Sequence, residues 1–250
     1  MIKSETRDRI ARIRIDRAEK KNAFTGEMYI ELAKALAAAD ADRETRAVLL
    51  HGSPDCFTAG NDIADFLKPR VGEPPVWNVF KTLPALKKPV VAAVGGPAVG
   101  IGTTLLLHCD LVYAAENARF QLPFVSLGII PEFGSTFLLP LIAGYQPAAE
   151  LLLLGQPFTA QKAYEVGIVT TVVPQQDLLQ EAEKAAKTLA ALPPESIRTT
   201  KKLMKSSFEG VISTRIMEEG RLVVERLRSP EAKEAMSAFL EKRKPDFSRF

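Results

Sequence analysis

Cysteine is scarce in this sequence: Cys56 and Cys109 are its two cysteines among 250 residues. A single pair cannot supply the disulfide framework of a small secreted domain. The Cys, His, Asp and Glu residues also show no metal-ligand spacing. We therefore expect a chain that folds around an apolar core in a reducing compartment and binds no metal.

Long apolar runs are also missing. The longest, such as Leu151–Leu154, fall far short of the roughly 20 residues that cross a bilayer. The polar stretch Met1–Glu5 is not followed by an apolar signal region, and the final Ser248-Arg249-Phe250 differs from the Ser-Lys-Leu peroxisomal address. We expect a cytoplasmic protein without a membrane partner.

Charge of one sign does not predominate. The chain has 33 basic and 30 acidic residues, for a net charge of +3. Nucleic-acid-binding proteins usually present a concentrated positive field, and this near balance does not provide one. We expect no nucleic-acid partner. The alternative, RNA binding by the basic C-terminal run, predicts binding that weakens steeply with salt.

What the sequence does contain is an alternation of strand and helix patterns. Residues 11–15 alternate apolar and charged side chains, which is typical of a half-buried strand. Thr25 is a suitable N-cap for a helix whose apolar positions 28, 32, 35, 36 and 39 form one stripe. Further buried strands are predicted at 47–51, 89–94 and 111–115, with a helix at 102–108. This order predicts an α/β fold with crossover connections.

The pattern changes toward the C-terminus. Residues 147–154 read as a helix that ends before Gly155, and Thr159 is expected to cap another short helix. From Gln176 onward the patterns are helical, interrupted by prolines and glycines. We predict a core over residues 1–190 and an all-helical region over residues 191–250. Its apolar positions need a surface to cover, either on the core or on another subunit.

Two glycine-bearing turns are the best candidates for chemistry. Residues 56–63 (CFTAGNDI) and 95–102 (GGPAVGIG) both follow predicted strands, and the second opens a helix. Glycine lets a ligand approach the backbone closely, and free N–H groups at a helix start favour an anion. Neither segment matches a dinucleotide fingerprint, a phosphate-binding P-loop or a G-x-S-x-G elbow. Tight structural turns are the alternative interpretation.

A series of further motifs accompanies these turns. They are DRAEKKNAF at 16–24, CD at 109–110, FQLP at 120–123, LGIIPEFGST at 127–136, and the segment 231–245, which ends AFLEKRKP. With the two turns, in this order and at this spacing, they closely resemble the crotonase superfamily, the enoyl-CoA hydratase/isomerase family. The resemblance covers nearly the whole chain.

The resemblance implies a crotonase-like spiral core of ββα turns with a C-terminal helical trimerisation region, and a homotrimer or dimer of trimers. It implies a coenzyme A thioester as substrate and no permanently bound cofactor. The two turns then form an oxyanion hole, and the family's donors correspond to the backbone N–H groups of Asn61 and Ile101. Asn61 stands where the family usually has Ala, but only its backbone N–H is needed. Such donors stabilise an enolate oxygen.

The positions of acidic residues separate the family's reactions. Hydratases resemble one another in using two glutamates, whose positions correspond here to Thr104 and Phe124, so hydration in the usual manner is not expected. Glu132, after Pro131, resembles the lone base of Δ3,Δ2-enoyl-CoA isomerases. Apolar walls from Ile63, Phe124 and Phe133 are expected to raise the pKa of Glu132. The alternative is a surface or helix-capping carboxylate.

Other candidate residues surround these groups. Lys20, Lys21 and the run 242–244 could meet coenzyme A phosphates, although a solvated face is preferred for Arg243 and Lys244. Asp62 is expected to bond backbone N–H groups of the first turn. Residues 64–80 fit no period and are expected to cap the acyl pocket. The predicted substrate contacts are Lys21, Ala23, Ala59, Asp62, Ile63, Gly100, Phe124, Phe133 and Lys242.

The leading hypothesis is therefore an isomerase that shifts a 3-enoyl-CoA double bond to trans-2, with Glu132 as its single acid/base. Hydration or another crotonase-type reaction, with a carboxylate placed unusually, is the enzymatic alternative. A non-catalytic acyl-CoA-binding protein is the alternative from a different class. His51 and His108 lie among apolar residues and are interpreted as core or turn histidines whose ring nitrogens are satisfied.

Overall fold

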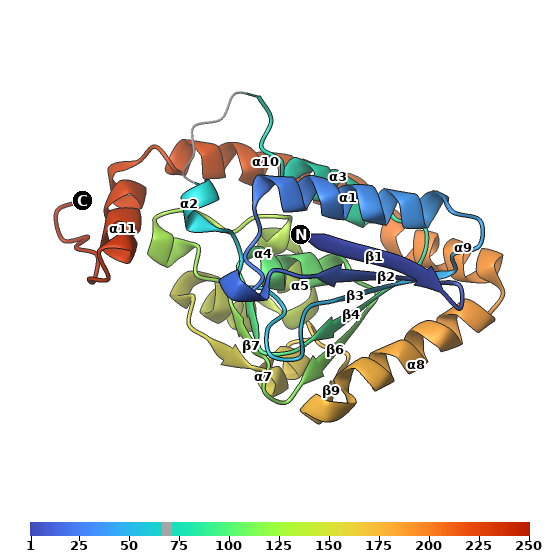
Figure 1. Ribbon diagram of the computed structural model, residues 1–250. Helices are drawn as coiled ribbons and strands as arrows, with labels where there is room; N and C mark the ends of the chain where they lie inside the picture. Colours follow the sequence, from blue (N-terminus) through green and yellow to red (C-terminus); the bar gives the residue numbers. More distant parts are fainter. Residues whose placement is uncertain (67–71) are drawn as a thin grey trace.

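The computed structural model describes residues 1–66 and 72–250. In this part of the chain a six-stranded sheet has the order β1-β2-β3-β4-β6-β9 (Figure 1). The β1-β2 pair is antiparallel and every other neighbouring pair is parallel. The strands are β1 (Ile2–Arg7), β2 (Ile10–Ile15), β3 (Ala47–His51), β4 (Val90–Val94), β6 (Leu111–Ala115) and β9 (Thr171–Val173).

Helices cover both faces of the large sheet. Helices α1 (Gly26–Ala41) and α3 (Trp77–Ala85) lie on one side of it, and α8 (Leu178–Ala191) lies on the other (Figure 1). Successive residues of β3 alternate between the two sides: Leu50 joins the core cluster that includes α1, and Leu49 joins the cluster that includes α8. Burial on both faces explains why the central strands are continuous apolar runs.

Most predicted elements are confirmed. The predicted strands correspond to β2, β3, β4 and β6. Thr25 caps α1 by accepting a hydrogen bond from the N–H of Met28 at 3.4 Å, and Thr159 caps α7 (Ala160–Glu165) by accepting one from Lys162 at 3.2 Å. The helix expected at 102–108 is a turn of α-helix, α4 (Ile101–Thr104), followed by the tighter 3-10 turn Leu105–His108.

Several short strands were not predicted. The edge strand β1 carries mainly exposed polar side chains, so no alternation marks it. A small second sheet consists of β5 (Pro97–Val99), β7 (Arg119–Gln121) and β8 (Phe158–Thr159). Two or three residues are too few to establish a period of two. These strands form because longer elements bring their backbones together.

Shorter helices complete the middle of the chain. The segment predicted as one helix at 147–154 is divided between α6 (Tyr145–Ala149) and a wider, π-helical turn. That turn is capped by Gly155, whose φ of 60° is left-handed. The remaining elements are α2 (Ile63–Phe66), α5 (Ser135–Ala143), α6 (Tyr145–Ala149), the π-helical turn Glu150–Leu154, and the 3-10 turns Ala18–Lys20, Val125–Leu127 and Gln175–Asp177.

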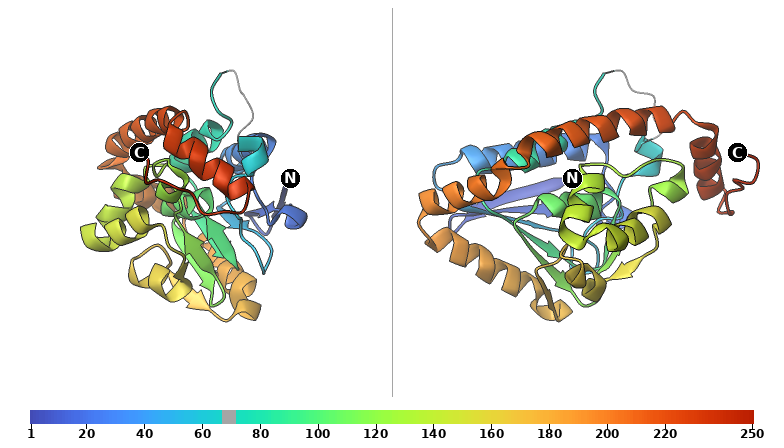
Figure 2. Two further views of the ribbon diagram at one scale, coloured as in Figure 1. Left: turned by 90° about the vertical axis from the view of Figure 1, so that its left-hand side faces the viewer. Right: turned by 180° about the vertical axis from the view of Figure 1, so that it is seen from behind.

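The C-terminal region is helical, as predicted. It consists of α9 (Pro194–Ser206), α10 (Glu209–Arg226) and α11 (Pro230–Leu240). Helix α10 runs along the molecule (Figure 2), and α11 lies at its end, packed against the 3-10 turn Val125–Leu127. The predicted boundary after residue 190 falls in the last turn of α8 and remains a prediction. No helix among residues 1–66 and 72–250 has the length and apolar character to cross a membrane.

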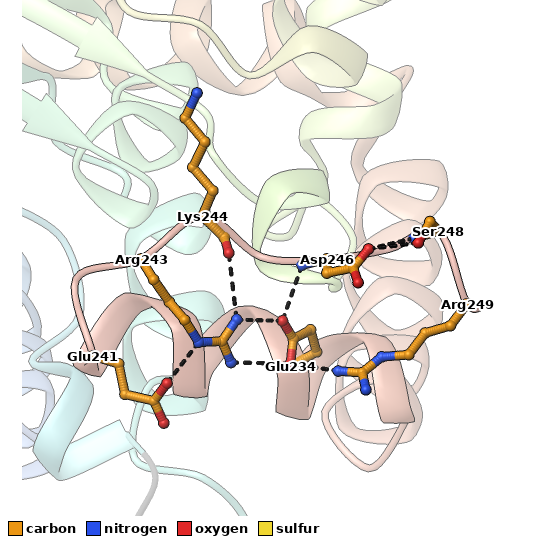
Figure 3. Close-up of polar contacts among 7 residues, drawn as sticks. All are labelled: Glu234, Glu241, Arg243, Lys244, Asp246, Ser248 and Arg249. Atoms are coloured by element: carbon orange, nitrogen blue, oxygen red, sulfur yellow. Dashed lines mark hydrogen bonds and ion pairs between the residues drawn. The ribbon is translucent and has the colours of Figure 1, made fainter.

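The last ten residues are folded back on α11 by one carboxylate (Figure 3). Glu234 accepts two hydrogen bonds from Arg243, one from Arg249 at 3.1 Å, and one from the N–H of Asp246 at 2.9 Å. The Arg243 guanidinium lowers the pKa of Glu234 to about 2. Arg243 is exposed, which agrees with its preferred interpretation as part of a solvated face, and Glu234 and Glu241 are its ion-pair partners there.

Helix α10 approaches α3 at Gly220, where an added Cβ would lie 2.3 Å from Cζ2 of Trp77. We expect Gly220→Ala to destabilise the fold by about 1–3 kcal/mol, because the overlap outweighs the higher helix propensity of alanine. Gly210 lies in the same helix with open space around it, so Gly210→Ala should be neutral or stabilising by up to about 1 kcal/mol. Urea unfolding measures both. Equal effects would contradict the packing at Trp77.

Candidate active site

The first glycine turn is held against residues 21–24. Asn22 is buried in a left-handed conformation (φ 56°), and its side-chain amide donates to the carbonyl of Cys56 at 2.8 Å. The N–H of Ala59 donates to the carbonyl of Lys21 at 2.9 Å, and the N–H of Asp62 donates to Phe24 at 2.9 Å. Two segments about 35 residues apart therefore share one hydrogen-bond ladder.

The second turn lies directly against the first. Gly60 has a φ of 90°, and a Cβ there would be 2.8 Å from the carbonyl oxygen of Val99. The N–H of Val99 donates to the carbonyl of Thr58 at 3.0 Å. Glycine is required at position 60 both for its positive φ and for the close approach of the second backbone.

This arrangement leaves both predicted donors available. The N–H group just before each donor is satisfied: Gly60 donates to Thr58 Oγ1 at 3.0 Å, and Gly100 donates to the carbonyl of Gln121 at 2.9 Å. Within the described ranges, neither Asn61 nor Ile101 has an acceptor for its N–H. Ile101 begins α4, and the first N–H groups of a helix have no partner in that helix. Two turns in contact thus leave two backbone donors unpaired, and their predicted role as an oxyanion hole remains a prediction.

Side chains of the first turn anchor it further. The Asn61 amide oxygen accepts a hydrogen bond from the Tyr29 hydroxyl of α1 at 2.6 Å. Sequence reasoning gave the Asn61 side chain no role and missed Tyr29. Asp62 accepts hydrogen bonds from Arg17 at 2.8 Å and from the N–H of Asp65 at 3.2 Å, and Arg17 lowers the pKa of Asp62. Asp62 thus accepts from a backbone N–H as expected, although that N–H belongs to α2 just after the turn, and its contact with a substrate remains a prediction.

Glu132 is buried, with 9% of its surface exposed. Its Oε1 accepts a hydrogen bond from Thr104 Oγ1 at 2.9 Å. Burial raises the pKa of Glu132 to about 8, against the lowering effect of Thr104, and the Glu219 carboxylate raises it further. Because α5 begins with Gly134 as its N-cap and Glu219 supplies the acceptors, Glu132 is neither a surface carboxylate nor a helix cap.

Thr104 connects this carboxylate with the second glycine turn. It ends α4, the short helix that Ile101 begins directly after that turn. The hydrogen bond from Thr104 therefore ties Glu132 to the same single helical turn that Ile101 opens. Phe124 is also close, since its Cζ lies 4.0 Å from where a Cβ on Gly100 would be. The fold therefore brings these predicted site residues together.

The backbone after Glu132 is strained and supported on both sides. Phe133 has a φ of 61°, which is rare for a residue with a Cβ. Its ring, fully buried, stacks on Phe80 at 4.3 Å and on His108 at 4.0 Å between centroids. The His108 Nε2–H donates to the Phe133 carbonyl at 2.8 Å, and burial lowers the pKa of His108 to about 3. The interpretation of His108 as a satisfied core histidine is confirmed.

Glu219, from distant α10, holds the start of α5. Its carboxylate accepts hydrogen bonds from the N–H of Gly134 at 2.6 Å, the N–H of Thr136 at 3.0 Å and the Thr136 hydroxyl at 2.6 Å. Sequence reasoning missed Glu219, because a single glutamate in a helical pattern resembles any solvated position. Its burial depends on α10 packing against α5.

The remaining predicted contacts lie around these elements. Lys21 and Lys242 have exposed side chains, and Lys242 follows the end of α11. Ile63 is partly buried at the start of α2, and the carbonyl of Ala23 accepts a hydrogen bond from Arg17 at 2.9 Å. Their contacts with a substrate remain predictions. Residues 67–71 of the predicted pocket cap lie outside the described residues.

Comparison with known proteins shows similarity to enoyl-CoA hydratases and isomerases along nearly the whole chain. The family model "Enoyl-CoA hydratase/isomerase" matches residues 5–249. The chain is 32% identical to a probable enoyl-CoA hydratase of Mycobacterium leprae, over 96% of this chain and 95% of that protein. It is 36% identical to enoyl-CoA delta isomerase 2 of Rattus norvegicus, over 94% of this chain and 62% of that protein.

A solved structure is similar throughout. The crystal structure of an enoyl-CoA hydratase/isomerase from Pseudoalteromonas atlantica superimposes with a TM-score of 0.95 at 40% identity, covering 98% of this chain and 99% of that one. The α/β architecture with a helical C-terminal region is thus the crotonase fold that the sequence predicted.

Replacing Glu219 tests whether its carboxylate holds the start of α5. Glu219→Ala leaves one buried and two partly buried donors without their acceptor, and a buried unpaired donor costs about 1–3 kcal/mol, so we expect a loss of about 2–3 kcal/mol in the free energy of unfolding. The neighbouring Glu218 is about half exposed, and Glu218→Ala should change stability by less than about 0.5 kcal/mol. Urea unfolding compares the two. Similar small effects would show that α10 does not hold α5.

Proposed function

The chain belongs to the enoyl-CoA hydratase/isomerase family and is an acyl-CoA enzyme of that type, and we propose that it shifts a 3-enoyl-CoA double bond to the trans-2 position. The similar proteins include both a hydratase and an isomerase. The reaction must therefore be argued from the site. The observation that carries the proposal is the buried carboxylate of Glu132, held beside the helix that begins with the Ile101 N–H.

The two positions that correspond to the hydratase glutamates support isomerisation. Thr104 uses its hydroxyl to hydrogen-bond Glu132, and Phe124 presents an apolar ring beside Gly100. Neither residue can activate a water molecule as a carboxylate does. Within residues 1–66 and 72–250, the second carboxylate that acts on Glu132 is Glu219, whose two oxygens already accept hydrogen bonds from Gly134 and Thr136. A single available carboxylate suits a reaction that moves one proton.

The proposed chemistry has two steps and no net change in composition. The Glu132 carboxylate removes a proton from C2, and the electrons move into a dienolate with negative charge on the thioester oxygen. The N–H groups of Asn61 and Ile101 donate to this oxygen, and each such donor is worth about 3–4 kcal/mol in the transition state. The carboxylic acid then returns the proton to C4, which leaves the double bond between C2 and C3.

Burial prepares Glu132 for both steps. With a pKa of about 8, the side chain can be a carboxylate or an acid near neutral pH. An acid/base group works best when its pKa lies close to the working pH. Coenzyme A enters as part of the thioester substrate, and the reaction needs no other cofactor. The predicted contacts at Lys21, Ala23, Ala59, Asp62 and Lys242 would serve to bind the coenzyme A portion.

The C-terminal helices support the proposed homotrimer or dimer of trimers. Apolar side chains remain exposed along α9 and α10, among them Leu203 (68% exposed), Met204 (72%) and Met217 (63%). Clusters of exposed apolar side chains are typical of surfaces that another subunit covers.

Replacing Glu132 tests the proposal directly. We expect Glu132→Gln to lower kcat for 3-enoyl-CoA by at least about 100-fold, because amide oxygen and nitrogen cannot exchange the proton. Affinity for an acyl-CoA should change little, since the oxyanion donors are backbone groups. The exposed Glu218→Gln is the matched control and should retain full activity. A loss well under 100-fold would remove Glu132 from the role of essential base.

The raised pKa predicts a pH dependence. The base form of Glu132 is the one that starts the reaction, and protonation removes it. Activity of the free enzyme, measured as kcat/KM, should therefore rise as pH increases through about 8 and level off above it. This limb should be absent from the residual activity of Glu132→Gln. A profile that levels off near pH 5 would contradict the burial of the carboxyl.

Product analysis distinguishes the alternatives. A panel of 2-enoyl- and 3-enoyl-CoA thioesters in heavy water reports hydration, isomerisation and exchange of the C2 protons together. Hydration of crotonyl-CoA at enzyme-like rates would favour a hydratase. Tight binding without exchange would favour a non-catalytic acyl-CoA-binding protein.

A further inference from the structure

Thr104 stands out among the residues that the sequence left without a function, because its hydroxyl is fully enclosed and points at the proposed base. The side chain is buried, and its Oγ1 lies 2.9 Å from Glu132 Oε1. The neighbouring Thr103 uses its hydroxyl for the fold, donating to the carbonyl of Ala98 at 2.6 Å. Two adjacent threonines therefore have separate partners, one in the backbone and one in the site.

The two oxygens of Glu132 are not equivalent. Oε1 accepts the Thr104 hydrogen bond, whereas Oε2 has no partner within residues 1–66 and 72–250. Among those residues, the Ser135 hydroxyl is the buried side-chain polar atom that lacks both a partner and contact with solvent. Oε2 has no partner and yet is not such a buried atom, so it retains some contact with solvent. A small group that enters the site can therefore reach it.

We propose that Thr104 is a positioning residue that reserves Oε1 of Glu132 for a fixed hydrogen bond, so that Oε2 both removes the C2 proton and returns it to C4. This inference rests on the proposed isomerase function and adds to it. The Thr104 hydroxyl can donate to Oε1 whether or not Oε2 carries a proton. The bond therefore persists through both steps, and the carboxyl does not need to rotate while it holds the proton.

The same residue fixes the distance between base and oxyanion hole. The N–H of Thr104 donates to the carbonyl of Gly100 at 3.0 Å, and its β-branched side chain has few rotamers. Ile101, whose N–H is a proposed oxyanion donor, begins the same turn of α4. The carboxyl of Glu132 is thus tied to the structural unit that would hold the thioester oxygen. A shift of about 1 Å between such groups is enough to reduce a rate 100-fold.

Three side chains from different elements determine the electrostatic surroundings of Glu132. Thr104 from α4 lowers its pKa, and Glu219 from α10 raises it. His108, from the 3-10 turn after α4, has its pKa lowered to about 3 and is neutral in the working range. Loss of the Thr104 hydroxyl should therefore remove a contribution that favours the charged base. The rise of kcat/KM with pH that reports Glu132 should then shift to higher pH.

The experiment compares Thr104→Val with Thr104→Ser. Val keeps the shape and removes the donor, so we expect kcat to fall by about 10- to 100-fold, the effect of losing a hydrogen bond to a charged group. KM should change less, and the limb of the kcat/KM profile should move to higher pH. Thr104→Ser retains the donor and should recover activity to within about 5-fold. The exposed Thr214→Val in α10 is the matched control.

Isotope transfer provides a second readout that is independent of the overall rate. With a substrate deuterated at C2, the wild type should deliver deuterium to C4, and Thr104→Val should deliver a smaller fraction because the carboxyl can rotate and exchange with solvent. If Thr104→Val does not fold, the same measurements are made on Thr104→Ala and compared with the pH profile of kcat/KM of Thr104→Ser. The inference would be overturned if Thr104→Val had the same kcat, the same pH profile of kcat/KM and the same deuterium transfer as the wild type. It would also be overturned if Thr104→Val and Thr104→Ser lost the same amount of activity.

These outcomes separate the inference from the proposed function. If Glu132→Gln retains activity on 3-enoyl-CoA, the proposed function fails. If Glu132→Gln is inactive while Thr104→Val behaves as wild type, only the role of Thr104 fails.

Discussion

The close approach of two backbone turns is the constraint on which the site depends. Gly60 packs against the carbonyl of Val99, and a side chain at position 60 would prevent that contact. The turns are joined further by the hydrogen bond from Val99 to Thr58. Among the described residues, the N–H groups of Gly60 and Gly100 have acceptors, and those of Asn61 and Ile101 do not. These two unpaired donors are the ones that the proposed reaction would use to stabilise a developing negative charge.

A second constraint is the burial of Glu132. A carboxylate removed from water tends to become neutral, and the raised pKa of Glu132 expresses that cost. The surrounding structure keeps the group in place through Thr104 on one side and the strained backbone at Phe133 on the other. Phe133 is in turn held by Phe80, His108 and the α5 start that Glu219 caps. Helix α10 therefore contributes to the site although its residues lie about 85 positions away in the chain.

Family membership and site geometry contribute different parts of the functional conclusion. The similarity to both a hydratase and an isomerase defines the acyl-CoA chemistry but does not choose between adding water and moving a proton. That choice depends on which side chains can exchange protons. Thr104 and Phe124 cannot, Glu219 is fully engaged, and Glu132 retains an open oxygen. The proposed isomerase activity follows from this distribution.

Sequence alone was sufficient for the features that depend on local pattern. The buried strands β3 and β4, the caps at Thr25 and Thr159, the helical C-terminal region and the two glycine turns each leave a mark within about ten residues. The crotonase resemblance extended this to Asn61, Ile101 and Glu132 as candidates. Features that depend on contacts between distant segments left no such mark. The Thr104–Glu132 bond spans 28 residues, the Tyr29–Asn61 bond 32 and the Glu219 cap 85, so only the tertiary structure decided which of the many polar side chains became buried partners. The physical reason is that burial turns an ordinary hydroxyl or carboxylate into a specific partner, and burial is a property of the packed chain.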